Sequence, residues 1–459
     1  MSHGRSTRAV DLRARGDRAM RWKEQTVHDS TTDLVKPHRW GLSSVSFSYY
    51  GRRYEGDGWL DWDPATGFRL EVNHARRKGA ALAPAELYTE RAVEERDFTS
   101  FRMECPPFIW AVAPRIFLGN RLGLFEEGSL VVETDRVLFL ARPSPILLPG
   151  SPLWEVSGLI ALPSRVLLPE WIETVVRVKE AVVEERSCSG AISWESRGVR
   201  ILARRLDDEW ATVHVVRGGR GRGRRQILRW PQAFCDAVSM LHGTSIPMIA
   251  YSRRYYGREL IDVRTRRPFT DLGALSPFRW SDPSMPRPEH TLALADYLSV
   301  PSAEALVCQR LLETLISAAG QKSVEVMMLL AATALEAAMR TLYGWPFHDK
   351  RRTGVVLTGL RKFCSEHGLL NHSVVIADTV CWAHTQLRDR NAHPDWLRPE
   401  VGDTLDSESY SCLLYLARFY GFMIGALAEI EALSNPFKLL PGQVGLSPHP
   451  KKPKRGRGN

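Results

Sequence analysis

The spacing of apolar residues changes once along this chain of 459 residues, and the change sets the fold class. In the first half, apolar side chains such as Val45, Phe47 and Tyr49 alternate with polar ones, which is the period of a half-buried β-strand. From Ser302 onward they recur every three or four residues, the period of a helix with one buried face. We therefore predict an α+β protein, with a β-rich N-terminal domain (a sandwich or curved antiparallel sheet) followed by an all-α bundle.

Composition marks the boundaries between these parts. The start of the chain is charged and has no helix cap, and a stretch rich in Pro, Ser and Gly separates the two patterns. The sequence predicts a disordered or loosely structured basic lead at 1–35, a β-rich domain at 36–268, a linker at 269–290, a helical domain at 291–440 and a basic disordered tail at 441–459.

Turn residues between the alternating stretches predict hairpins in the first half. One joins 59–62 to 68–72 across Pro64–Gly67, and another joins 210–216 to 226–230, with a short helix at 231–243 after it. In the second half we expect helices at 302–316, 323–343, 355–366, 374–390 and 409–433.

A Gly-rich segment between residues 217 and 225 carries five arginines and is expected to form the loop of the second hairpin. Arginine offers forked donors to phosphate, and glycine lets the backbone close on a strand of RNA. The alternative is a solvated, flexible turn. The segment lacks the Gly-Lys-Ser/Thr ending of a P-loop and is not expected to open a helix. The candidate RNA-binding residues are Arg217, Arg220, Arg222, Arg224 and Arg225.

The composition favours a soluble, cytoplasmic protein with an anionic partner. A net charge of +10 and a pI near 9.3 put nucleic acid ahead of a membrane, although a generally Arg-rich composition would give the same values. The seven cysteines form no Cys-x-x-Cys pair, which predicts reduced thiols and no metal site. No apolar block opens the chain, and charges interrupt the apolar runs near Met327 and Phe419, so we expect no secretory signal and no membrane span.

One short segment carries a candidate catalytic pair, Arg388 and His393. Pro394 disfavours the helical conformation for His393, so the imidazole is expected to leave the helix end. In a regular helix, positions five apart point about 140° away from each other. The two side chains therefore converge only at a frayed helix end, or through a second copy of the motif on a partner chain.

The residue types in this segment suit metal-free cleavage of RNA. Such cleavage needs a base for the 2′-hydroxyl, an acid for the leaving oxygen and a cation for the phosphoryl group. His393 suits either proton role and Arg388 the fixed cation, with Asn391 as a hydrogen-bonding partner. The alternative is that the charges only stabilise a helix end and His393 begins a turn. Supporting candidates are Asp389 and Arg390.

These residues resemble the active motif of HEPN-domain ribonucleases, in which Arg, four to six mostly polar residues and His follow long apolar helices. The run from Leu329 to Tyr343, which contains Ala334-Leu335-Glu336, is similar to the Ala-Leu-Glu helix of that family, in particular of its ApeA-like anti-phage branch. Pro394 departs from the family pattern, where many members carry a small residue. Glu336 either pairs locally with Arg340 or orients Arg388 in the site.

The resemblance implies a metal-independent endoribonuclease without cofactor that forms a cyclic phosphate in a bacterial defence or toxin role. It also implies a homodimer through the helical domain, because one histidine cannot easily fill both proton roles. RNA, with tRNA as one candidate, and a phage-derived trigger or regulator are the expected partners. The alternatives are a catalytically inactive HEPN module that binds RNA, and an interaction protein whose helical half only dimerises.

Overall fold

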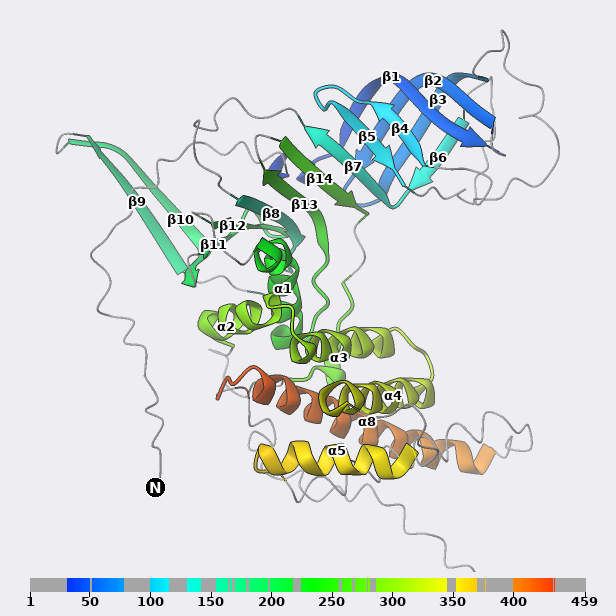
Figure 1. The fold of residues 1–459 in the computed structure, drawn as a ribbon, viewed down its shortest axis with the longest axis vertical. Helices are drawn as coiled ribbons and strands as arrows, with labels where there is room; N and C mark the ends of the chain where they lie inside the picture. Colours follow the sequence, from blue (N-terminus) through cyan, green and yellow to red (C-terminus); the bar gives the residue numbers. More distant parts are fainter. Residues whose placement is uncertain are drawn as a thin grey trace, which may run out of the picture.

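The structure, a computed structural model, describes residues 31–49, 52–77, 100–114, 130–141, 154–163, 166, 170–178, 181–196, 199–217, 224–255, 258–265, 269–278, 280, 286–344, 352–369, 376, 399–431 and 433. Strands gather at one end of the molecule and helices stack at the other (Figure 1). The predicted α+β class with a β-rich N-terminal half is confirmed.

The described strands form one antiparallel sheet in the order β6-β3-β2-β1-β4-β5-β7-β14-β13-β8-β12-β11-β10-β9. Its first part is built from β1 His38–Tyr49, β2 Arg52–Asp63, β3 Gly67–Arg77, β4 Phe101–Glu104, β5 Trp110–Ala113, β6 Leu130–Thr134 and β7 Arg136–Ala141, after the short 3-10 helix η1 Thr32–Val35. Its second part is built from β8 Trp154–Ala161, β9 Glu170–Val178, β10 Ala181–Ser196, β11 Val199–Arg205, β12 Trp210–Arg217, β13 Met248–Tyr255 and β14 Arg258–Arg264.

The hairpin predicted around Pro64–Gly67 is confirmed as β2–β3. Trp62 pairs with Phe68, and the Asp63 carboxylate accepts hydrogen bonds from the backbone of Ala65 at 2.7 Å and of Thr66 at 3.2 Å. Gly67 has a φ of 96°, a conformation that favours glycine. The turn is therefore specified by residues that are neighbours in sequence.

Two hydrophobic cores lie on opposite faces of this sheet. Strands β1 to β7 enclose the first, around side chains such as Phe47, Trp62 and Phe139. The second lies between the sheet and the helices. Strand β8 belongs to both, since Leu159 is buried in the first core and Ile160 in the second. Successive residues of a strand point to opposite faces, so one sheet can join two cores.

Helix α1, Arg224–His242, covers the sheet where the second hairpin was expected, and the prediction of a strand at 226–230 is wrong. Ile227, Trp230, Phe234 and Leu241 are buried at helical spacing. The stretch 226–230 is too short to show this period alone, and Pro231 suggested a boundary there. In the structure Pro231 lies inside the helix, against Gly158 of β8, where an added Cβ would come within 2.9 Å of the proline.

The C-terminal half contains helices that stack below α1 (Figure 1). Ser302 and Ser323 begin two of the helices as side-chain caps, accepting from Ala305 N at 3.0 Å and Val326 N at 3.3 Å. The last helix begins ten residues before its predicted start, and of the helix predicted at 374–390 only residue 376 is described. The described helices are α2 Pro288–Ser299, α3 Ala303–Ala319, α4 Val324–Tyr343, α5 Arg352–Glu366 and α8 Pro399–Leu427.

Residues 269–278, in the predicted linker, are packed against the helices. Leu272, Leu275 and Phe278 are buried in the second core, and Arg418 of α8 donates to the carbonyl of Ser276. Apolar residues in this Pro- and Ser-containing stretch give it a buried face. The sheet and the helices therefore share one continuous core.

Two helical segments, Val324–Tyr343 and Tyr410–Leu427, are long and apolar enough to cross a membrane by length and composition alone. The core helix of a soluble protein meets the same criterion, and 72% of the apolar stretch in α8 is buried against 39% in α4. Helix α8 therefore fills the core, whereas α4 keeps one side exposed.

Candidate functional site

In the sequence, the predicted catalytic segment falls between two described helices, α5 and α8, that both pack on α4. Ile376, upstream of the motif, is buried in the second core, and α8 begins at Pro399, downstream of it. Helices α5 and α8 each contact α4. The motif residues themselves lie outside the described part of the chain: Arg388, Asp389, Arg390, Asn391 and His393.

Glu336 is the one predicted site residue of the helical half that the structure describes. Its side chain is buried on α4, and Arg340, one turn on, donates a hydrogen bond to its carboxylate. The Arg340 side chain is 42% exposed, so the pair lies at the edge of the core. The local pairing predicted for Glu336 is confirmed, and it holds the carboxylate in place on the helix.

The basic segment 217–225 joins a strand to a helix, and its predicted place in a hairpin is wrong. Strand β12 ends at Arg217, and Arg224 and Arg225 open α1. The expectation that this segment opens no helix is therefore also wrong. Arg220 and Arg222 lie outside the described residues. The N-terminus of a helix favours anions, which is compatible with a phosphate-binding role for the segment.

A polar network between α1 and α3 escaped the sequence analysis. The Asp236 carboxylate accepts hydrogen bonds from Gln232 Nε2 at 2.8 Å and from Gln309 Nε2 at 3.0 Å, and Gln309 Oε1 accepts from Arg229 at 3.1 Å. Burial raises the pKa of Asp236 to about 6, against these two hydrogen bonds, which favour the charged form. The only sign of this network in the sequence is Asp236 itself, a carboxylate inside an amphipathic stretch. Its partner Gln309 lies 73 residues away, so the sequence does not show the pairing.

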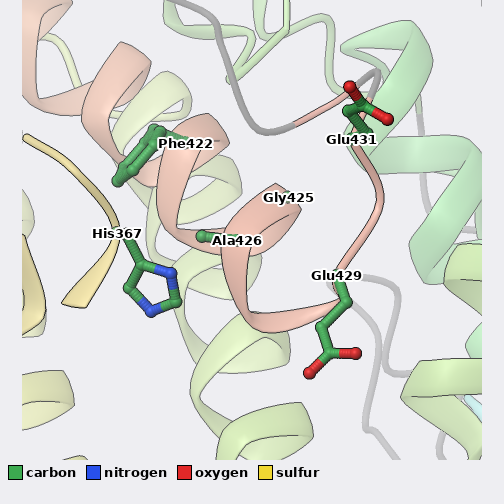
Figure 2. Close-up of a pocket in the computed structure, with 6 residues that line it drawn as sticks. All are labelled: His367, Phe422, Gly425, Ala426, Glu429 and Glu431. Atoms are coloured by element: carbon green, nitrogen blue, oxygen red, sulfur yellow. The ribbon is translucent and has the colours of Figure 1, made fainter. Parts of the chain in front are cut away.

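A pocket of about 280 Å³ opens at the ends of α5 and α8. His367 lines it beside Phe422, and its ring contacts that of Phe363 in a tilted arrangement with 4.6 Å between centroids. The side chains of Glu429 and Glu431 lie apart from His367 and from each other (Figure 2). The pocket thus contains acidic and imidazole groups but no assembled acid–base pair.

Within the described ranges, no three His, Cys, Asp or Glu side chains converge as metal ligands would. Five cysteines are described, and all are buried free thiols: Cys105, Cys235, Cys308, Cys364 and Cys412. Burial raises the pKa of the Cys105 and Cys308 thiols to about 12, so both are held in the unreactive protonated form.

Fold and described residues together define an α+β protein in which a long antiparallel sheet and a C-terminal layer of helices share a core. Comparison with protein-family models, with curated proteins and with solved structures finds no match for this chain.

Proposed function

We propose that this protein is a metal-independent endoribonuclease of the HEPN type. In this proposal His393 transfers protons and Arg388 stabilises the charge on the phosphoryl group, while Asn391 orients the histidine or the phosphate. Attack by the RNA 2′-hydroxyl then breaks the bond to the 5′-oxygen and leaves a 2′,3′-cyclic phosphate. A role in bacterial defence or as a toxin, with tRNA as one candidate substrate, belongs to the same proposal.

The arrangement around α4 is the observation that carries this proposal. Glu336 of the Ala334-Leu335-Glu336 run is buried and held by Arg340. The helices before and after the motif segment both pack on this helix, and Tyr420 of α8 donates to the Ala331 carbonyl. The motif thus lies, in sequence, between two helices that pack on the Ala-Leu-Glu helix, which agrees with the HEPN resemblance.

The exposed side of α4 supports the homodimer in this proposal. Val326 and Leu330 are 38% and 36% exposed, and Thr333, Ala337 and Thr341 continue the same stripe, with Arg340 at its edge. If two copies pack antiparallel, the large residues near the start of one helix face the small residues near the end of the other. Such a stripe is complementary to itself, as a two-fold interface requires.

The test compares wild type with His393→Ala on total tRNA and on a mixed RNA ladder, in EDTA. His367→Ala is the matched control, because it removes an exposed histidine that directly follows α5, at a site the proposal does not use. We expect His393→Ala to slow cleavage at least about a hundredfold, as loss of general acid–base catalysis does, and His367→Ala to cleave like wild type. Cut ends should carry a cyclic phosphate, and 2′-O-methyl RNA should resist.

Equal cleavage by wild type and His393→Ala would refute this assignment. If neither cleaves while both are folded and dimeric, the inactive RNA-binding or dimerising alternative replaces the enzyme.

A further inference from the structure

One face of strands β4, β5, β7, β14 and β13 presents apolar and arginine side chains in register. The cross-strand pairs join Trp110 to Leu140, Leu140 to Leu260 and Leu260 to Arg253. The neighbouring row joins Arg102 to Val112, Val112 to Leu138 and Leu138 to Asp262. These two rows define what we name the open sheet face.

The described helices leave this face open. On the opposite side of the same strands, Ala111, Phe139 and Ile261 are buried in the first core. On the open side, α1 covers β8 and β12 and reaches only to Tyr251 of β13, whose hydroxyl donates to the Leu228 carbonyl at 2.9 Å. Strand β7 is apolar on both sides, yet Leu138 and Leu140 are only partly buried. These side chains therefore keep apolar surface that is accessible to a ligand.

Charge on the open sheet face favours an anionic ligand. Arg253 is exposed and forms no ion pair with any residue the structure describes, and the Arg102 guanidinium lies 5.9 Å from the Trp110 ring centroid. Two carboxylates lie on this face. Glu104 lies on the same exposed side of β4 as Arg102 and accepts a hydrogen bond from Ser43 at 3.2 Å. Asp262 accepts hydrogen bonds from Arg136 at 2.8 Å and 2.9 Å and from Arg264 at 3.0 Å, so the four arginines of the face outnumber its two carboxylates.

Apolar and aromatic side chains between arginines suit a polymer that carries both flat bases and phosphates. Four adjacent strands place Trp110 roughly 14 Å from Arg253, enough for a short single-stranded stretch. A duplex fits poorly, because its bases are already stacked and paired and offer no free face to Trp110.

We propose that the open sheet face binds single-stranded RNA, with a base stacked on Trp110 and phosphates held by Arg102 and Arg253. The inference rests on the proposed ribonuclease function, for which this face would capture the substrate.

The test measures binding of the full-length chain to a fluorescein-labelled 12-nucleotide oligouridine with 2′-O-methyl groups, by fluorescence anisotropy at several salt concentrations. The probe lacks the 2′-hydroxyl, so it is bound without being cut. We expect Trp110→Ala to weaken binding about tenfold or more, as loss of base stacking does. Arg253→Gln should weaken binding about threefold to tenfold and lower the slope of log affinity against log salt by about 0.7, the value for one phosphate contact on a single strand.

A matched pair of controls lies elsewhere on the sheet. The Arg39 guanidinium lies 4.8 Å from the Trp59 ring centroid, but carboxylates of Asp61 at 3.3 Å and Glu71 at 4.0 Å neutralise it. We expect Arg39→Gln and Trp59→Ala to bind the probe within about twofold of wild type, since surface changes away from a contact have small effects.

Unchanged affinity in Trp110→Ala and Arg253→Gln, an equal loss in the control variants, or no binding by wild type would overturn the proposal. Equal affinity for the probe annealed to its complement would refute base stacking. Trp110→Phe keeps an aromatic ring and should restore most of the affinity, and Arg253→Gln tests the face even if Trp110→Ala does not fold. Because the probe is uncleavable, failure of the open sheet face is distinguishable from absence of ribonuclease activity.

Discussion

Replacing Asp236 by Asn should change how the stability of this protein depends on pH. The raised pKa means that the folded chain holds a proton on Asp236 more tightly than the unfolded chain does, between the ordinary value of 3.8 and about 6. The contribution to stability is therefore fully present below pH 3.8 and is lost as pH rises to about 6. Asn stays neutral throughout, and its single amide oxygen accepts one of the two hydrogen bonds that Gln232 and Gln309 donate to the separate oxygens of Asp236.

The magnitude follows from that difference in pKa. Each pKa unit corresponds to about 1.4 kcal/mol, so a rise from 3.8 to about 6 corresponds to about 3 kcal/mol of unfolding free energy. We expect the unfolding free energy of Asp236→Asn, relative to that of wild type, to rise by up to about 3 kcal/mol between pH 4 and pH 7, on top of a constant cost for the lost hydrogen bond. In a chain of this size, such a gain raises the melting temperature by several degrees.

Thermal melts of wild type and Asp236→Asn from pH 4 to pH 8 provide the assay, since titration of all other groups is common to both proteins. Glu55→Gln is the control, because Glu55 lies 43% exposed on β2, away from Asp236, in an ion pair with Arg53. Its melting temperature should differ from wild type by about the same small amount at each pH. If the melting temperature of Asp236→Asn relative to that of wild type stays constant or falls as pH rises, the pKa of Asp236 is not raised in the folded protein.

Two further predictions test the packing of the helices. Leu330→Glu should convert the proposed dimer to a folded monomer, measured by light scattering after gel filtration. Leu306→Glu, at a site 46% exposed on α3, should leave the dimer intact. If both variants remain dimeric, or if both become monomeric, the α4 stripe is not the dimer interface. Gly421→Ala should lower stability by about 1–3 kcal/mol despite better helix propensity, because its Cβ would lie 2.2 Å from the Pro277 carbonyl oxygen; a melting temperature at or above that of wild type contradicts this close contact.

Features that depend on neighbouring residues were predictable from the sequence. The β2–β3 turn is specified by Asp63 and Gly67, and α3 and α4 begin at their Ser302 and Ser323 caps. The change from strand to helix period gave the fold class for the same reason, since each period is visible within a few turns or strands. The local pairing of Glu336 with Arg340 also lies within one helical turn.

Long-range contacts were decided only in the tertiary structure. The row that runs from Trp110 through Leu140 and Leu260 to Arg253 depends on which strands become neighbours, and strand pairing is selected by packing of the whole core. The Asp236 network likewise needs α1 and α3 to meet, and the stretch 226–230 became helix because its buried face fits the sheet. Local patterns fix the type of an element, whereas burial energy summed over distant residues fixes what each element touches.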